Sequence, residues 1–177
     1  YGVHPYVLMS FNGNIDSVFT LAHEMGHSLH SWYSNHTQPF TYAEYRLFVA
    51  EVASTCNEAL LIRYLLKHAK EKEEKIFLLN YFLDQFKGTV FRQTMFAEFE
   101  MLTHKEVENG GVLTAEWMCK LYNDLNHQYF GSALAPDDYI QYEWARIPHF
   151  YRAFYVYQYA TGYSAATAIS AKILAEG

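Results

Sequence analysis

Cysteine and proline are scarce in this sequence. Its 177 residues include two cysteines and four prolines. Two thiols cannot form a disulfide framework, and both Cys56 and Cys119 fall within helical patterns without the neighbours of a reactive nucleophile. We therefore expect two small buried residues in a reducing compartment, and we expect the protein to be cytoplasmic.

The chain also lacks an excess of positive charge, long apolar runs and low-complexity tracts. Lysine and arginine total 13 against 19 aspartate and glutamate residues, which gives a formal net charge of −6. Nucleic-acid binding favours a basic face, and a membrane span needs about 20 consecutive apolar residues. The sequence therefore predicts neither nucleic acid nor a membrane as a partner, and no signal peptide opens the chain.

Apolar and aromatic side chains are abundant. Hydrophobic residues make up 51% of the chain and aromatic residues 18%. A chain of this length can bury a sizeable core. Because neither an internal repeat nor a linker-like stretch divides the sequence, we expect a single catalytic domain over residues 1–177.

Apolar periodicity predicts a mainly α-helical fold. Asn14 and Asp16 are both candidates for the N-cap of the first helix. Residues 5–11 alternate weakly before the turn signal Asn12-Gly13, which predicts a short N-terminal β-strand or hairpin. Helices are expected at about residues 16–33, 43–70, 73–107 with an interruption at Gly88, 114–129, 136–146 and 164–174.

The most informative feature is the pentad His-Glu-Met-Gly-His at residues 23–27, inside the first predicted helix. Histidines four residues apart share one helix face, so His23 and His27 can bind the same metal ion. Glu24 then stands where a general base would take a proton from metal-bound water. This is the zincin pattern, and it predicts one Zn²⁺ ion per chain. Gly26 costs a helix about 1 kcal/mol relative to alanine, which favours close approach of another segment there.

A catalytic zinc site needs a third protein ligand, with water in the fourth position. His30 lies seven residues from His23, an axial offset of about 10 Å, which is too far for both to bind one ion. The helix at residues 43–70 offers carboxylates instead. We choose Glu51, because the small residues around it let two helices approach closely. Glu58, two turns later, is expected to accept a hydrogen bond from a ligand histidine and fix its tautomer.

Three separated stretches together resemble one family. They are TLAHEMGHSLHSWYS at residues 20–34, FVAEVASTCNEALL at residues 48–61 and IPHFYRAFYVYQYATG at residues 147–162. The chain resembles the oligoendopeptidase F branch of the thimet oligopeptidase family over essentially its whole length. Members of that family are zinc metallopeptidases that cut short peptides and leave folded proteins alone. The resemblance implies a zincin-type helical catalytic domain.

The resemblance also assigns roles to residues. It implies that His23, His27 and Glu51 bind zinc, and that Glu24 is the general base when zinc-bound water attacks the scissile carbonyl. It further implies that the third stretch faces the zinc, where a phenol or imidazole stabilises the oxyanion. The residues expected there are catalytic His149, Tyr155 and Tyr157, with Tyr151 and His149 binding substrate. On the N-terminal segment, His4 is a further residue expected to bind substrate.

Two rival functions stay open. An exopeptidase on the same scaffold would hold the terminal carboxylate of its substrate with a basic residue, for which Arg146 and Arg152 are candidates. A helical binding module would use the pentad for a structural zinc, and such sites normally have four protein ligands and no water. The main prediction is a zinc-dependent metalloendopeptidase that hydrolyses short oligopeptides.

The first residue is Tyr1 rather than methionine. The resemblance implies a considerably longer natural protein, whose upstream segments would wall the other side of a substrate channel. We therefore expect this chain to be the C-terminal catalytic portion. Its expected partners are oligopeptide substrates and the missing N-terminal part of the same protein, and apolar faces meant for that part are expected to be exposed.

Overall fold

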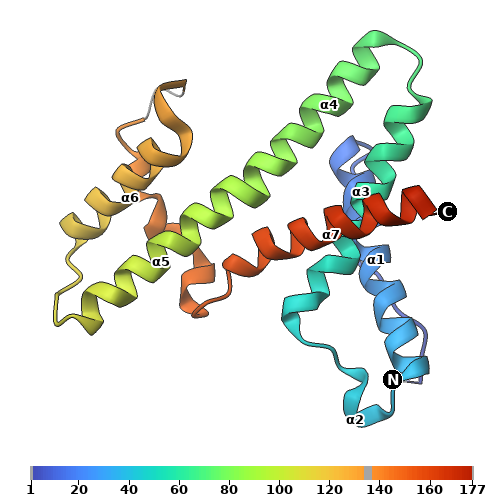
Figure 1. Ribbon diagram of the computed structural model, residues 1–177, viewed down its shortest axis with the longest axis horizontal. Coiled ribbons are helices and arrows are strands. Elements are labelled where there is room, and N and C mark those ends of the chain that lie inside the picture. The colour runs from blue at the N-terminus through green and yellow to red at the C-terminus, as the bar shows by residue number, and fades with distance from the viewer. Residues whose placement is uncertain (1, 134–136, 177) are drawn as a thin grey trace. The chain divides into compact units, whose positions relative to one another are not determined.

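The computed structural model describes residues 2–133 and 137–176 (Figure 1). The chain divides into two compact units. Unit 1 consists of Tyr1–Gln85 and Thr161–Gly177, and unit 2 consists of Phe86–Ala160. The expectation that both belong to one domain stays a prediction.

Helices account for the regular structure of both units. Unit 1 contains α1 (Ile15–Thr37), α2 (Phe40–Ala43), α3 (Leu47–His68), most of α4 (Lys72–Phe86) and most of α7 (Tyr157–Glu176). Unit 2 contains the π-helical turn η1 (Lys87–Phe91), α5 (Arg92–Glu108), α6 (Ala115–Phe130) and the short 3-10 helices η2 (Gly131–Ala133), η3 (Ile140–Arg146) and η4 (Pro148–Tyr151). The predicted mainly helical fold is confirmed. No helix in the described part of the chain is long and apolar enough to span a membrane.

The predicted N-terminal strand or hairpin is wrong. Residues 2–14 form no β-strand in the structure, and strands are absent from all the described residues. Pro5 and Val7 instead line a groove of about 400 Å³ together with residues of α1. A helix satisfies its own backbone hydrogen bonds, so it offers no ladder to an extended neighbour. A lone extended segment beside a helix therefore stays irregular.

Local sequence signals explain how the helices begin and change. Asn14, rather than Asp16, caps α1, because its Oδ1 accepts a hydrogen bond from the backbone N–H of Ser17 at 2.9 Å. The predicted interruption at Gly88 coincides with the π-helical turn between α4 and α5. The predicted boundary at Gly162 is wrong, since α7 runs through it. Pro136, the expected start of another helix, lies outside the described residues.

The helices α1 and α3 cross in direct contact (Figure 1). A Cβ atom placed on Gly26 of α1 would lie 2.6 Å from the Cα of Ser54 and 2.9 Å from the carbonyl oxygen of Ala53 in α3. Only glycine fits at this crossing. The close approach of the two helices therefore explains why Gly26, which lowers helix propensity, stands in the interior of α1. Asn57 of α3 adds a hydrogen bond from its Nδ2 to the carbonyl oxygen of Ala22, at 2.6 Å.

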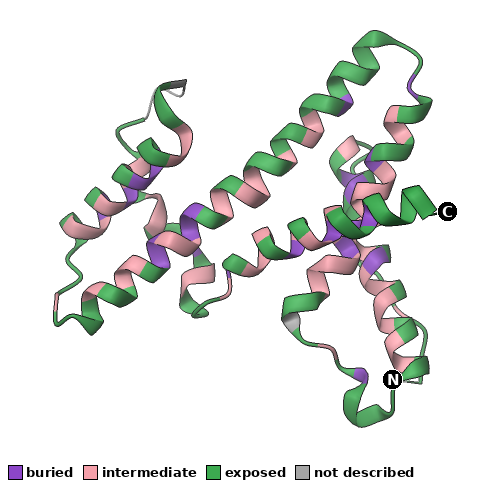
Figure 2. Ribbon diagram, in the orientation of Figure 1, coloured by how far each residue is buried: buried purple, intermediate pink, exposed green. Residues whose placement is uncertain are grey.

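Each unit has its own apolar core, and the buried residues of Figure 2 mark it. In unit 1 the core is small and consists of Phe19, Ile62, Ala69 and Leu78. In unit 2, α5 and α6 pack around Met95, Phe96, Phe99, Tyr122, Leu125, Ile147 and Val156.

The apolar stripe of α1 does not belong to the core of unit 1. Leu21, Met25 and Leu29 are 41%, 43% and 50% exposed. Apolar side chains spaced along one helix face normally pack against another element. The exposure of this stripe agrees with the expectation that the chain presents apolar faces to solvent.

Candidate metal centre

The two histidines of the pentad lie next to each other on α1. The Nε2 atoms of His23 and His27 are 3.1 Å apart, and their rings meet edge to face with centroids 4.8 Å apart. About a quarter of each side chain is exposed, at 27% and 26%. The four-residue spacing thus brings two imidazole nitrogens to one partly open point on the helix surface.

A carboxylate from α3 completes a triangle with these nitrogens. Glu51 Oε2 lies 3.3 Å from His23 Nε2 and 3.6 Å from His27 Nε2. Ligands about 2.0–2.1 Å from a tetrahedral zinc ion are separated by roughly 3.3–3.5 Å. The three donor atoms therefore fit a single zinc ion without rearrangement of the helices. His23, His27 and Glu51 are also the one group in the described part of the chain with metal-binding geometry.

Glu51 is held in place by its own helix. The hydroxyl of Ser54 donates to Glu51 Oε2 at 3.2 Å and to the Glu51 carbonyl oxygen at 3.1 Å, and Ser54 is fully buried. The hydrogen bond with His23 lowers the pKa of Glu51, and together with the charges of both histidines and the hydrogen bond from Ser54 it outweighs the opposing effect of burial. Glu51 is therefore ionised at neutral pH, as a metal ligand must be.

Glu58 lies on the other side of the His23 ring. Its Oε1 is 2.5 Å from His23 Nδ1. A carboxylate at Nδ1 directs Nε2 toward the metal, because a neutral imidazole carries only one N–H. In the absence of metal, burial lowers the pKa of His23, but the hydrogen bonds and charges of Glu51 and Glu58 outweigh it and raise that pKa to about 10.

Glu24 follows His23 directly on α1 and is half-buried. Among the described residues its carboxylate forms no hydrogen bond or ion pair. A carboxylate beside the ligand histidines without a partner of its own can accept and release a proton.

His30 stays outside the triangle, as its seven-residue spacing from His23 requires. Its ring stacks on Tyr45 with centroids 3.7 Å apart. Burial and the nearby charge of His27 lower the pKa of His30. His30 is therefore a neutral packing residue at pH 7.

The predicted site residues of the third stretch lie in unit 2, on η4, on the turn that follows it and at the start of α7. His149 and Tyr155 stack in parallel with centroids 5.6 Å apart. Tyr159, which was not among the predicted site residues, joins them: its hydroxyl lies 2.9 Å from that of Tyr155, and its ring centroid lies 5.9 Å from that of His149. The four-residue spacing of Tyr155 and Tyr159 was the available signal. We call His149, Tyr155 and Tyr159 the aromatic cluster.

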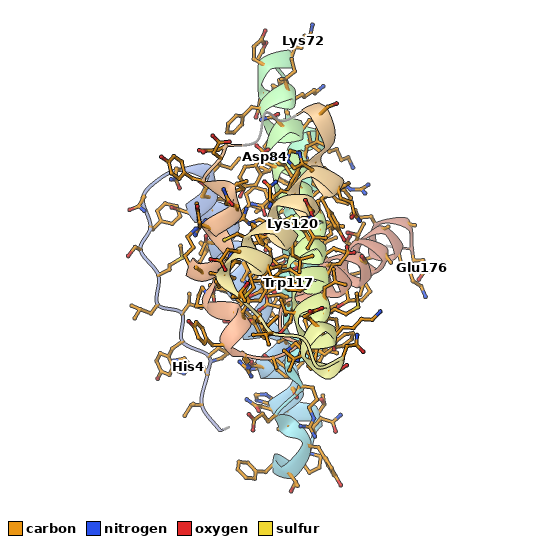
Figure 3. The ribbon with its side chains drawn as sticks, turned by 90° about the vertical axis from the view of Figure 1, so that its left-hand side faces the viewer. His4, Lys72, Asp84, Trp117, Lys120 and Glu176 are labelled. Carbon is orange, nitrogen blue, oxygen red and sulfur yellow. The ribbon has the colours of Figure 1, made fainter. Side chains whose placement is uncertain are left out.

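The remaining predicted site residues, catalytic Tyr157 and the substrate contacts Tyr151 and His4, are open to solvent. Tyr151 is 91% exposed and Tyr157 is 43% exposed. His4 lies on the extended N-terminal segment, as Figure 3 shows, and its ring contacts Tyr6 with centroids 4.5 Å apart. His4 is therefore not part of the metal triangle.

Two comparisons of sequence identify relatives. The model of Peptidase family M3 matches residues 2–177. "Oligopeptidase PepF" of Bacillus subtilis (strain 168) is 54% identical over 177 residues, which is 100% of this chain and 26% of that protein. "Oligoendopeptidase F, chromosomal" of Lactococcus lactis subsp. cremoris is 48% identical over 174 residues, covering 98% of this chain and 29% of that protein.

Two solved structures superpose on this chain. Oligoendopeptidase-F from Enterococcus faecium superposes with a TM-score of 0.78 at 48% identity, over 92% of this chain and 29% of that one. A putative peptidase from Chlamydophila abortus superposes with a TM-score of 0.88 at 47% identity, over 98% of this chain and 29% of that one.

The chain spans between a quarter and a third of the length of these relatives, at 26% and 29%. That the chain is the C-terminal catalytic portion of a longer protein stays a prediction. The family itself follows from a match over nearly every residue. The chain belongs to peptidase family M3.

Proposed function

We propose that this chain is the zinc-binding catalytic portion of a metalloendopeptidase that hydrolyses short oligopeptides. The triangle of His23, His27 and Glu51 carries the proposal, because its sides of 3.1, 3.3 and 3.6 Å match the ligand separations of one zinc ion. The names of the relatives, an oligopeptidase and an oligoendopeptidase, support the substrate class.

The residues present fit zinc in both number and chemistry. His23, His27 and Glu51 would hold the ion, and Glu58 would fix the tautomer of His23. When bound there, zinc supplies a Lewis acid that polarises the scissile carbonyl and lowers the pKa of water to about 7.

Glu24 supplies the proton transfers in this proposal. Its carboxylate accepts the proton of the attacking water and then passes that proton to the leaving amine. We propose His149, Tyr155 and Tyr157 as donors that stabilise the negative charge developing on the carbonyl oxygen, and Tyr151 and His4 as further substrate contacts. The ring contacts of His149 with Tyr155 support the first two assignments. Removing one such donor typically costs about 3 kcal/mol of transition-state stabilisation.

Observations at the basic residues weigh against an exopeptidase. The guanidinium of Arg146 is already paired with Glu143, at 2.5 Å. The guanidinium of Arg152 lies over the ring of Tyr155, 5.2 Å from its centroid. Charge reversal of Arg152 separates the two activities, because an exopeptidase would lose nearly all turnover and an endopeptidase little.

The number of donors weighs against a structural zinc. Among the described residues three donors gather at the site, whereas structural zinc sites normally use four protein ligands. An incomplete ligand set is the arrangement that leaves room for water and substrate.

The test uses the full-length zinc-loaded protein and a quenched fluorescent oligopeptide. We expect E24Q to keep one zinc per chain and to lose at least about 10³-fold in kcat, because it keeps the ligands and removes the base. H27A should lose both zinc and turnover. H36A is the matched control, since His36 is an exposed histidine of the same helix. Full turnover by E24Q, or in the presence of a chelator, would contradict the proposal.

We propose that the partners are oligopeptides and the remainder of the longer protein, and that the protein acts in the cytoplasm. The groove bounded by Leu29, Tyr33, Val49 and Ile169 is apolar and measures about 380 Å³. It supports the remainder of the protein as a partner more than it supports oligopeptides, because an apolar surface fits packing against the same polypeptide better than selective binding of a polar peptide.

A further inference from the structure

A strained turn immediately precedes Tyr155. Phe154 has φ of +57°, and it is the one non-glycine residue with positive φ in the described part of the chain. Bulky side chains rarely adopt this left-handed conformation, and it persists only where surrounding contacts hold it. The contacts that hold Phe154 therefore determine how the backbone enters Tyr155.

Two residues of α5 contact Phe154, and the side-chain amide of Gln158 also donates to the Phe154 carbonyl oxygen at 3.3 Å. Glu100 is only 5% exposed, and its Oε1 accepts a hydrogen bond from the backbone N–H of Phe154 at 2.7 Å. One turn later, the ring of His104 packs against the ring of Phe154 with centroids 4.8 Å apart. Glu100 thus holds the backbone of the turn, and His104 contacts its side chain.

Burying the side chain of Glu100 lowers the stability of the fold unless another contact offsets the cost. No lysine or arginine forms an ion pair with it among the residues that the structure describes. A buried carboxylate is costly without compensation, and a hydrogen bond from a backbone amide to an ionised oxygen is stronger than a neutral one. The contact with Phe154 is the compensation that the structure provides.

The turn leads directly into the aromatic cluster. Tyr155 stacks on His149, and its hydroxyl lies 2.9 Å from that of Tyr159. We propose that Glu100 is a positioning residue that holds Phe154 in its left-handed conformation and thereby orients Tyr155 within this cluster. The proposal rests on the proposed function to the extent that Tyr155 acts on substrate.

The experiment changes the reach of the Glu100 carboxylate in the full-length zinc-loaded protein. E100D keeps the charge but is one methylene shorter, so it cannot reach the Phe154 amide from the same backbone position. We expect kcat to fall about 10- to 100-fold, with KM changed less than about threefold and zinc content unchanged. E100Q keeps an acceptor oxygen at the same reach and should stay within about threefold of the unaltered kcat.

Hydrogen exchange of the Phe154 amide is the readout that does not depend on activity. It should become at least about tenfold faster in E100D and stay slow in E100Q. E98D is the matched control: Glu98 is on the same helix and accepts a hydrogen bond from the hydroxyl of Tyr129 at 2.7 Å. Unchanged kcat and exchange in E100D, or an equal loss of kcat in E98D, would overturn the proposal.

A second variant covers the case in which E100D does not fold. F154G adopts positive φ without strain, so it should fold, but its turn has more freedom. We expect a lower kcat at unchanged KM, and full kcat in F154G would count against the proposal. If the unaltered protein hydrolyses no peptide, the proposed function fails, while the exchange of the Phe154 amide in E100D against E98D still decides whether Glu100 holds the turn.

Discussion

The side chain of His23, a proposed metal ligand, lies between two carboxylates. Its Nε2 lies 3.3 Å from Glu51 and its Nδ1 lies 2.5 Å from Glu58. In the metal-free protein these partners raise the pKa of His23 to about 10 against the opposing effect of burial. The charged imidazole contributes stability that is fully present below the unfolded pKa of about 6.5 and is lost as the pH rises through about 10.

At the scale of this residue we predict that zinc binding releases a proton. A zinc ligand must be a neutral imidazole, so at pH 8 the ion displaces about one proton from His23. Calorimetric titrations in buffers of different ionisation enthalpy measure the number directly. E58Q should release fewer protons, because it removes one of the two carboxylates that raise the pKa. Release of almost none at pH 8 would show that His23 has an ordinary pKa.

At the scale of elements, the crossing of α1 and α3 sets the geometry of the candidate metal centre. Two of the proposed ligands come from α1 and the third from α3, so the distance between the helices determines the distance between donors. Gly26 and Ser54 lie at the point of closest approach, and Asn57 ties the same helices together at Ala22. A small change in this packing therefore reaches the site directly.

We predict that G26A loses stability and zinc affinity together. The added Cβ would lie 2.6 Å from the Cα of Ser54, so the helices must separate. Such overpacking typically costs about 1–3 kcal/mol, against a gain of about 1 kcal/mol in helix propensity. Zinc affinity should fall at least about tenfold. Urea unfolding and zinc titration measure the two effects.

The matched control for this prediction is G88A. A Cβ at Gly88 meets no atom within 4 Å, so the change should leave zinc affinity unaltered. Wild-type zinc affinity in G26A would show that the helix crossing does not set the ligand distances.

At the scale of the whole molecule, the chain exposes many apolar side chains. Tyr33 and Phe48 are 59% and 46% exposed, and Trp32 is 41% exposed. These residues belong to α1 and α3, the helices that also carry the metal ligands. A relative such as the Bacillus subtilis protein is about four times longer, since this chain covers 26% of it. Apolar faces of this kind are the surfaces that further polypeptide covers.

We therefore predict that the isolated chain binds zinc but has little or no peptidase activity. The metal donors all lie within unit 1, so zinc affinity should persist. In the proposed function, turnover also needs substrate contacts from the remainder of the longer protein. The measurement compares hydrolysis of a quenched fluorescent peptide by the isolated chain and by the full-length protein, with size-exclusion chromatography to detect association. Robust turnover by the isolated chain would contradict this prediction.

Sequence spacing alone determined the local features of this protein. The 3.6-residue period gave the helices, and four-residue spacing placed His23 and His27 on one face of α1, because both depend only on neighbours within two turns. The cap at Asn14 and the π-helical turn at Gly88 are local in the same sense. Glu51 was selected as the third ligand from small neighbouring residues, a signal of close helix packing rather than of metal binding.

Only the tertiary structure decided the contacts between residues that lie far apart in the sequence. Residues 5–11 had the pattern of a strand but met a helix, which has no free backbone groups to pair with. The crossing of α1 and α3 brought Glu51 and Glu58 to opposite nitrogens of the His23 ring. The left-handed turn at Phe154 and its contact with Glu100 join residues 54 positions apart. No periodicity encodes such contacts, because they arise only when packed helices fix the distances between side chains.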